Sequence, residues 1–176
     1  MSRLQVFRAD DSSVATLATE DGGVIASKLS EIGVRFERWP TRASGDDILA
    51  AYAPEIALLK AGGGFQTVDV VSVTPDHPDR AVMRTKFLSE HTHAEDEVRF
   101  FVAGEGLFTL HHDGRVFDVL CTEGDLISVP AGMKHWFDMG AAPQFTAIRL
   151  FVNPDGWVAA FTGDDISDRF PRHEPA

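Results

Sequence analysis

The residues of this sequence that are suited to chemistry lie in two short segments, one around position 93 and one around position 135. His91 and His93 stand two residues apart, and Glu97 follows with the same parity. Successive side chains of a β-strand alternate between its two faces, so residues of one parity point the same way. His135 comes after a turn-forming Pro-Ala-Gly segment on an expected strand, and return strands can bring it back to the first group. We therefore expect these four side chains to meet.

Three neutral imidazoles and one carboxylate suit a divalent Fe, Ni, Mn, Co or Zn ion, and they leave two positions of an octahedral ion open for a chelating substrate. A structural zinc site more often uses thiolates and closes all its positions, and Cys121 is the single cysteine. The alternative is that His91 and His93 are ordinary surface residues near a turn, which a lone His-x-His would favour. The added Glu97 and His135 favour a metal site instead.

Parity extends this site to neighbouring side chains. Arg99 shares the face of Glu97, and a guanidinium that points into an apolar barrel needs an anionic partner. That partner is either an anionic substrate or a structural ion pair with Glu95, Asp96 or another acid, and the sequence leaves both open. Three aromatic residues are expected to be core residues or pocket lining: Phe87, Phe137 and Trp157. The four remaining histidines are expected in loops, in a solvated turn or in the tail: His77, His111, His112 and His173.

The elements that must position these residues change in character along the chain. Apolar spacing predicts a helix around residues 21–33, and an acidic start with glycines at its end predicts another over 46–60. From Thr67 the pattern has period two, and Asp113-Gly114 is a strong hairpin signal. Strands are expected over 67–73, 81–87, 97–102, 106–111, 115–120, 125–129, 134–137 and 145–152. Many short strands at even spacing predict an antiparallel sandwich or barrel.

Composition limits the classes of function. The 176 residues suit one domain, with a helix-containing part over about 1–65, a barrel over about 66–155 and a C-terminal tail. A formal net charge of −11 repels nucleic acids and anionic membranes, so we expect neither as a partner. With one cysteine, no signal-like apolar run and no obvious need for a large interface, we expect a cytoplasmic monomer.

Two segments resemble the motifs of the cupin superfamily. Residues 91–104, beginning HTHAEDEVRFFV, resemble the first cupin motif, and residues 124–135 (GDLISVPAGMKH) resemble the second. Within that superfamily, residues 91–102 and 129–138 (VPAGMKHWFD) are similar to the acireductone dioxygenase family. The general second motif often ends with Asn where this chain has Met139, a departure compatible with the narrower family. The resemblance implies a cupin-type jelly-roll barrel that is mainly β, with a few helices, mostly in the N-terminal third.

The resemblance also implies an activity. The substrates would be acireductone (1,2-dihydroxy-3-keto-5-methylthiopentene) and dioxygen, in methionine salvage, with one Fe²⁺ or Ni²⁺ per chain. The iron form would yield 4-methylthio-2-oxobutanoate and formate, and the nickel form 3-methylthiopropanoate, formate and carbon monoxide. By the same resemblance His91, His93, Glu97 and His135 bind the metal, and Arg99 faces the substrate oxygens near Phe87, Phe137 and Trp157. The alternatives are another cupin dioxygenase, a non-catalytic ligand-binding cupin and an oxygen-independent sugar isomerase.

Overall fold

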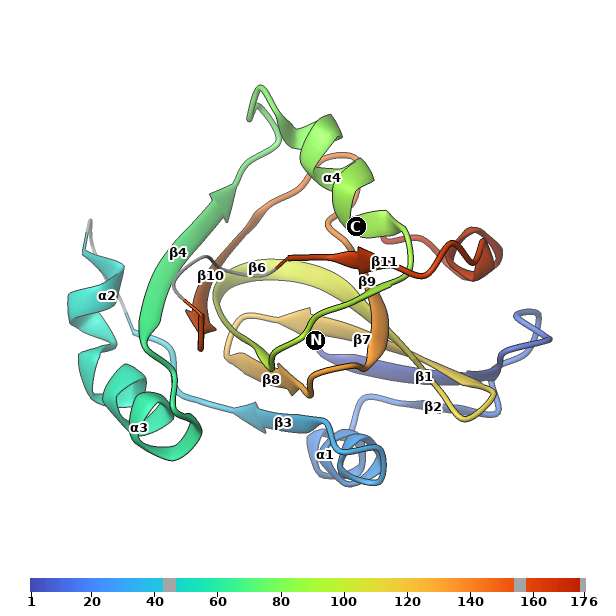
Figure 1. The fold of residues 1–176 in the computed structure, drawn as a ribbon, viewed down its shortest axis with the longest axis horizontal. Helices are drawn as coiled ribbons and strands as arrows, with labels where there is room; N and C mark the ends of the chain where they lie inside the picture. The colour runs from blue at the N-terminus through green and yellow to red at the C-terminus, as the bar shows by residue number, and fades with distance from the viewer. Residues whose placement is uncertain (43–46, 154–157, 175–176) are drawn as a thin grey trace.

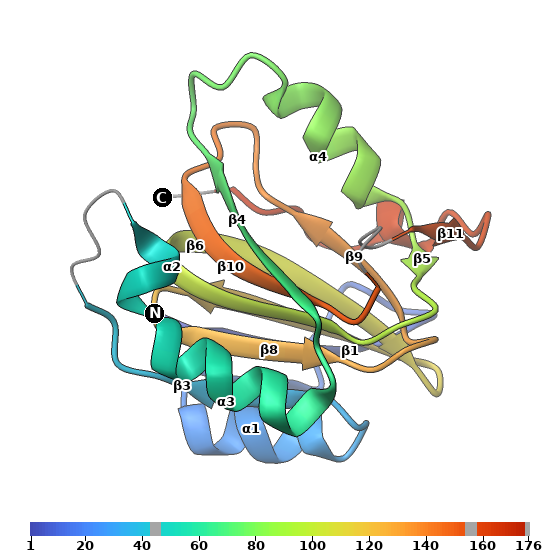
Figure 2. The ribbon, with the colours of Figure 1, turned by 60° about the vertical axis from the view of Figure 1, so that its left-hand side comes forward.

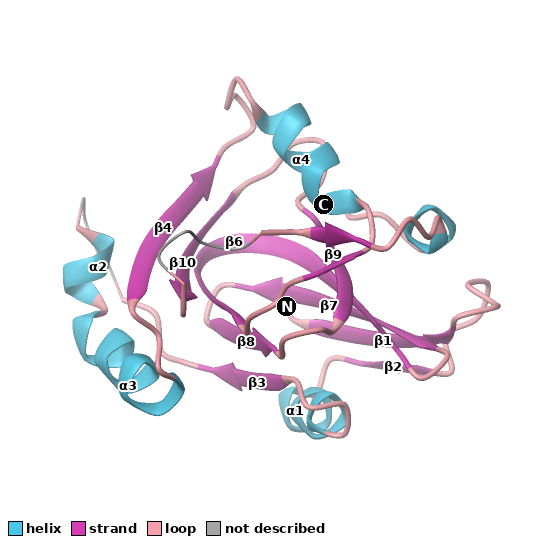
Figure 3. Ribbon diagram, in the orientation of Figure 1, coloured by secondary structure: helices cyan, strands magenta, loops and turns pink. Residues whose placement is uncertain are grey.

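A computed structural model describes residues 1–42, 47–153 and 158–174. Its described strands are β1 (Arg3–Arg8), β2 (Leu17–Thr19), β3 (Arg35–Arg38), β4 (Thr67–Val73), β5 (His91–Thr92), β6 (Glu97–His112), β7 (Arg115–Thr122), β8 (Asp125–Val129), β9 (Lys134–Asp138), β10 (Phe145–Phe151) and β11 (Ala160–Phe161). The helices are α1 (Gly22–Ser30), α2 (Ile48–Ala51), α3 (Ala53–Gly63), α4 (Arg80–Leu88) and the 3-10 helix η1 (Ile166–Arg169). Strands form the centre of the molecule and helices lie at its periphery (Figures 1 and 3). Among the described residues no helix is long and apolar enough to cross a membrane.

The long strand β6 joins the two halves of an antiparallel barrel. Its first part, from Glu97, pairs with β8 and β10, whereas its second part, up to His112, pairs with β7 and β9. The predicted strands 97–102 and 106–111 are thus one strand. The β6–β7 turn has positive φ at Asp113 (48°) and Gly114 (68°), as a two-residue hairpin turn requires, and this confirms the predicted hairpin.

Three apolar clusters explain why so many strand residues are hydrophobic. The largest fills the barrel and includes Phe101, Phe108 and Phe137. A second lies between the outer face of β6, β8 and β10 and the helices α2 and α3, which Figure 2 shows side by side with these strands. A third joins Val116 and Trp136 to Ile166 and Phe170 of the C-terminal segment. Because both strand faces are covered, the alternation of polar and apolar residues is weak in these strands.

Two helix predictions need adjustment. The helix predicted over 46–60 is two helices separated at Tyr52, and the second continues to Gly63. Asp47 caps the first by accepting from the Ala50 N–H, in agreement with the predicted acidic start. Residues 43–46 lie outside the described part. The helix predicted over 21–33 is confirmed as α1, capped by Asp21.

The strand predicted over 81–87 is wrong, because these residues form α4. Met83 and Phe87 pack against the barrel core. Their spacing of four residues fits one helix face and also one strand face, so period alone does not separate the two. Arg84, on the same helix, forms two hydrogen bonds with the buried carboxylate of Asp138 on β9, at 2.7 and 3.0 Å. This pair holds α4 beside the strand that carries His135.

Candidate metal centre

Strands β5 and β9 bring the first and last of the predicted ligands together. His91 and His135 are direct partners across the antiparallel pair, and their ring centroids are 4.5 Å apart. Only 2% of either residue is exposed. Residues far apart in the sequence therefore meet on one face, as the return-strand argument predicted.

His93 lies just beyond the end of β5, in the loop that leads to β6. Its carbonyl oxygen accepts from the Gly132 N–H at 2.9 Å, and the Asp96 carboxylate accepts from the Ala131 N–H at the same distance. The loop that carries His93 is thus bonded to the turn that precedes β9, the strand that carries His135. One ligand atom from each of His91, His93 and His135 lies within 4.8 Å of the other two, a separation that one metal ion can span.

Backbone carbonyls fix the tautomer of all three rings. The Nδ1 atom of His91 is 2.7 Å from the Ser89 oxygen, that of His93 is 3.0 Å from the Val158 oxygen, and that of His135 is 2.8 Å from the Met133 oxygen. A carbonyl oxygen only accepts, so each Nδ1 donates its proton. In the neutral ring Nε2 then carries a lone pair, which is the state that a metal ion needs.

Glu97 and Arg99 begin β6 and both point into the barrel, as their parity predicted. Glu97 is 2% exposed and Arg99 3%. The Arg99 Nε atom lies 3.0 Å from Oε1 of Glu97. The acid that pairs with Arg99 is therefore Glu97 itself, a predicted ligand, rather than Glu95 or Asp96. The guanidinium also lies among three aromatic rings, with its carbon 4.7 Å from the Phe137 centroid and farther from those of Phe108 and Phe87.

These contacts test whether the donor set fits a cation. Oε2 of Glu97 lies 3.0 Å from Nε2 of His135 and 3.2 Å from Nε2 of His93. With both Nδ1 atoms protonated, neutral rings turn lone pairs toward a carboxylate oxygen, which is repulsive unless a proton or a metal ion lies between them. Buried nitrogen and oxygen atoms that converge in this way, and that need a proton or a metal ion between them, are the pattern of a metal site. The residues fit a divalent ion.

The pKa values follow from the same geometry. Burial, together with the nearby His135, lowers the pKa of His91 to about 4, so its ring is neutral near pH 7. Burial alone would lower the pKa of His93, but the hydrogen bond and the charge of Glu97 outweigh burial and raise it. Burial would also raise the pKa of Glu97, yet the Arg99 charge and the bonds with His135 and His93 hold it well below its usual range. Glu97 is thus a carboxylate.

The predicted pocket residues have different outcomes. Phe137 points inward with the barrel core, as expected. Phe87 also reaches Arg99, with its ring centroid 5.8 Å from the guanidinium carbon, but it does so from α4 rather than by strand parity. Trp157 lies outside the described residues. Phe108, which sequence reasoning missed, has its ring 5.2 Å from the same carbon. Its parity is opposite to that of Glu97 and Arg99, because β6 has a register shift between Phe101 and Ala103, so parity could not have found it.

Glu95 and Asp96, the two acids named as possible partners of Arg99, accept from backbone N–H groups instead. Glu95 accepts from the Asn153 N–H at 2.8 Å, as Asp96 does from Ala131. His111, expected in a solvated turn, is instead half-buried, and its Nδ1 is 2.6 Å from the carboxylate of Glu90, a residue that sequence reasoning missed. No local sequence pattern indicates that Glu90 is buried and bonded, because its partners His111 and Thr162 are distant from it in the sequence.

Three comparisons with known proteins agree. The model of the ARD/ARD′ family matches residues 15–159. An acireductone dioxygenase of Hahella chejuensis is 56% identical over 179 residues, which are 99% of this chain and 97% of that protein. One of Pseudomonas aeruginosa is 56% identical over 177 residues, 97% and 98% of the two chains. The solved structure of an acireductone dioxygenase from Bacillus anthracis, with a cadmium ion in its active center, superposes with a TM-score of 0.79 at 34% identity, covering 92% of this chain and 98% of that one.

Proposed function

The chain belongs to the ARD/ARD′ family and is an acireductone dioxygenase, and on this premise we propose which of its residues hold the metal and meet the substrate. The enzyme is an oxidoreductase that uses dioxygen to cleave acireductone in methionine salvage. The observation that carries the site assignment is the convergence of three Nδ1-protonated imidazoles, two of which face the carboxylate of Glu97.

His91, His93 and His135 would hold one divalent ion through their Nε2 atoms, with Glu97 as the fourth ligand. When bound, the ion supplies Lewis acidity and a template on which an enediolate substrate is held by two of its oxygens. The buried site excludes water from the ligands, which strengthens each charge interaction within it. The carbonyl oxygens of Ser89, Val158 and Met133 keep the three rings in the tautomer that binds a metal, in which Nδ1 is protonated.

Arg99 would place positive charge beside the substrate and the Glu97 carboxylate. Its side chain cannot lose its proton under ordinary conditions, so it orients an anion without exchanging protons with it. The rings of Phe87, Phe108 and Phe137 hold the guanidinium in position. We propose that Phe87 and Phe137 also border the substrate; Trp157 lies outside the described residues.

The resident ion is proposed as Fe²⁺ or Ni²⁺, because the imidazole and carboxylate set accepts both. The products proposed are those of the family: the keto acid and formate with iron, and methylthiopropanoate, formate and carbon monoxide with nickel. Metal analysis of protein from its own host, paired with a carbon monoxide assay, distinguishes the two. We propose a monomer in the cytoplasm, where the buried thiol of Cys121 stays reduced. Light scattering and cell fractionation test these two points.

The chelation model is tested by anaerobic mixing of acireductone with protein loaded with Fe, Ni, Co or Mn. We expect the near-ultraviolet band of the substrate to shift for the wild-type chain and not for a His93→Ala variant. The matched control is His112→Ala, whose ring lies on the exposed hairpin. A wild-type protein that leaves the band unchanged with every metal would contradict the proposal, as would full binding by His93→Ala.

A further inference from the structure

Glu90 is a buried acidic residue directly before the first metal-ligating histidine. Its side chain has no exposed surface. Oε2 lies 2.6 Å from Nδ1 of His111 on β6, and Oε1 accepts from the Thr162 hydroxyl at 2.8 Å. The Glu90 carbonyl oxygen also accepts from the Thr162 N–H at 3.1 Å. With His111 donating, both carboxylate oxygens and the carbonyl oxygen of Glu90 are engaged.

Glu90 occupies the outer face of the strands whose inner face carries the metal ligands. His91 points into the barrel, so its neighbour Glu90 points out. His111 follows the core residue Leu110 and also points out. In the sheet β9 lies between β5 and β6, and His135 pairs with His91 on one side and with Leu110 on the other. The Glu90–His111 bond therefore passes behind His135, on the opposite face of β9.

The other arm of this network reaches the C-terminal segment. Thr162 follows β11, which pairs with β5 only through Ala160 and Phe161. A few residues earlier, Val158 supplies the carbonyl oxygen that receives the Nδ1 proton of His93. The ring of Phe161 packs edge-on against His91, with centroids 5.8 Å apart. Residues 158–162 thus contact the two ligands His93 and His91, and the hydrogen bonds from Thr162 to Glu90 hold this segment in place.

We propose that Glu90 is a positioning residue that holds β5, β6 and β11 in register behind the metal ligands. This inference rests on the metal site proposed above. Removing a carboxylate that accepts from His111 on β6 and from Thr162 after β11 leaves both segments free to shift. Mutation of residues that hold metal ligands in place typically changes metal affinity by about 10- to 100-fold. A two-residue strand such as β5 has little pairing of its own to resist such a shift.

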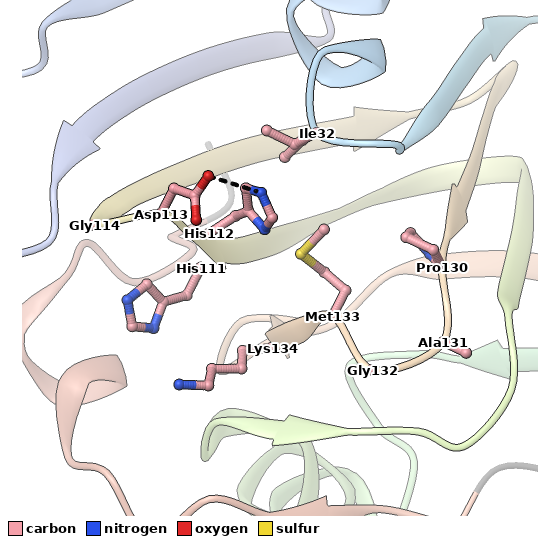
Figure 4. A pocket seen from close by; sticks show the side chains of 10 residues that line it. All are labelled: Ile32, His111, His112, Asp113, Gly114, Pro130, Ala131, Gly132, Met133 and Lys134. Atoms are coloured by element: carbon pink, nitrogen blue, oxygen red, sulfur yellow. Dashed lines mark ion pairs between the residues drawn. The ribbon is translucent and has the colours of Figure 1, made fainter.

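His111 also lines an open cavity of about 490 Å³ with Lys134 and Met133. Figure 4 shows the rings of His111 and His112 directed away from each other, as adjacent residues of a strand require. Substitution of His111 therefore changes a side chain beside solvent rather than one enclosed in the core. This makes His111 the safer position for a test that preserves folding.

The test measures cobalt-loaded protein, not turnover. We expect Glu90→Leu to release Co²⁺ to a chelator about 10-fold faster or more than wild type, and to change the visible absorption bands that report ligand geometry. His111→Phe and Thr162→Val, which each remove one donor, should change both readouts in the same direction. His111→Asn, whose amide can donate from near the place of Nδ1, should restore values close to wild type.

Asp118→Asn is the matched control. Asp118 is also a buried carboxyl bonded to a hydroxyl, that of Thr109, and it shares the outer parity of Val116 on β7, away from β5 and β11. We expect this variant to release Co²⁺ at the wild-type rate and to have the wild-type visible absorption spectrum. Unchanged release and spectra in His111→Phe and Thr162→Val would overturn the proposal, and so would equal changes in His111→Asn and His111→Phe. If wild type itself fails to bind Co²⁺, the metal site proposed above is wrong instead.

Discussion

The inner and outer faces of the strands around β9 both carry histidines, but the rings have different partners. On the inner face, the Nδ1 atoms of His91, His93 and His135 all bond to backbone carbonyl oxygens. Three other histidines have carboxylate partners: Glu90 for His111, Asp113 for His112 at 3.3 Å and Glu105 for His173 at 3.5 Å. The Nδ1 atom of His77 accepts from the Asp79 N–H at 3.1 Å.

This difference decides which rings can bind a metal. A carbonyl partner fixes the Nδ1 proton and adds no net charge, so the neutral ring presents Nε2 as a ligand. The inner rings also converge, with one ligand atom of each within 4.8 Å of those of the other two. The inner histidines thus differ from the others in their Nδ1 partners and in their convergence on one point.

The largest expected contrast between the two groups is in metal binding. His135→Ala removes one Nε2 ligand and should weaken metal binding by more than about 100-fold and abolish turnover. His112→Ala removes an exposed ring on the hairpin and should leave both unchanged. Titration calorimetry with Co²⁺ measures the affinity. Tight, stoichiometric binding of Co²⁺ by His135→Ala would contradict the assignment of the inner histidines as metal ligands.

The buried ion pair of the inner face gives the next largest effect. Arg99→Met leaves the Glu97 carboxylate buried without its cation, and breaking such a pair typically costs about 3–5 kcal/mol. The metal-free variant should therefore unfold at lower urea concentration. Zinc should restore part of the lost stability, because a divalent ion beside Glu97 replaces the missing positive charge. Equal destabilisation with and without zinc would show that the ion does not lie beside Glu97.

The outer face carries a buried carboxyl with the opposite pKa shift. Burial raises the pKa of Asp118 from 3.8 to about 7, and a hydrogen bond from Thr109 only partly offsets it. A raised pKa means that the folded chain favours the protonated acid, so the stability it contributes is full below pH 3.8 and falls as pH rises toward about 7. Asp118→Asn removes the ionisable carboxyl, and with it the loss of stability at higher pH.

We expect Asp118→Asn to be more stable than wild type at about pH 8, by up to about 4 kcal/mol, and the gain to shrink at about pH 5. Urea midpoints at the two pH values give the comparison. A gain that is equal at both values would assign the effect to packing and not to the charge.

Strand parity was sufficient to predict much of the site. Glu97 and Arg99 share the inner face because they lie on one regular strand, and His135 returns beside His91 through antiparallel pairing. Parity failed where the backbone was not a strand. Residues 81–87 form α4, so Phe87 reaches Arg99 by a helical route.

The hydrogen bonds around the ligands could not be predicted from local pattern. Val158 and Thr162 contact His93 and Glu90 only because the C-terminal segment returns to β5, and no spacing in the sequence records that return. The partner of Arg99 cannot be predicted from strand parity for a similar reason. Side chains of one parity need not touch, and only the closed barrel places Oε1 of Glu97 3.0 Å from the Arg99 Nε atom.

The most direct test of the account is a long-range proton–nitrogen correlation spectrum of the histidine rings, recorded before and after zinc is added. We predict that His91, His93 and His135 keep a protonated Nδ1 throughout, and that zinc shifts their Nε2 resonances while those of His111, His112 and His173 stay in place. A protonated Nε2 on any of the three inner rings in the zinc-loaded protein, or a metal shift on His111, His112 or His173, would contradict the central claim.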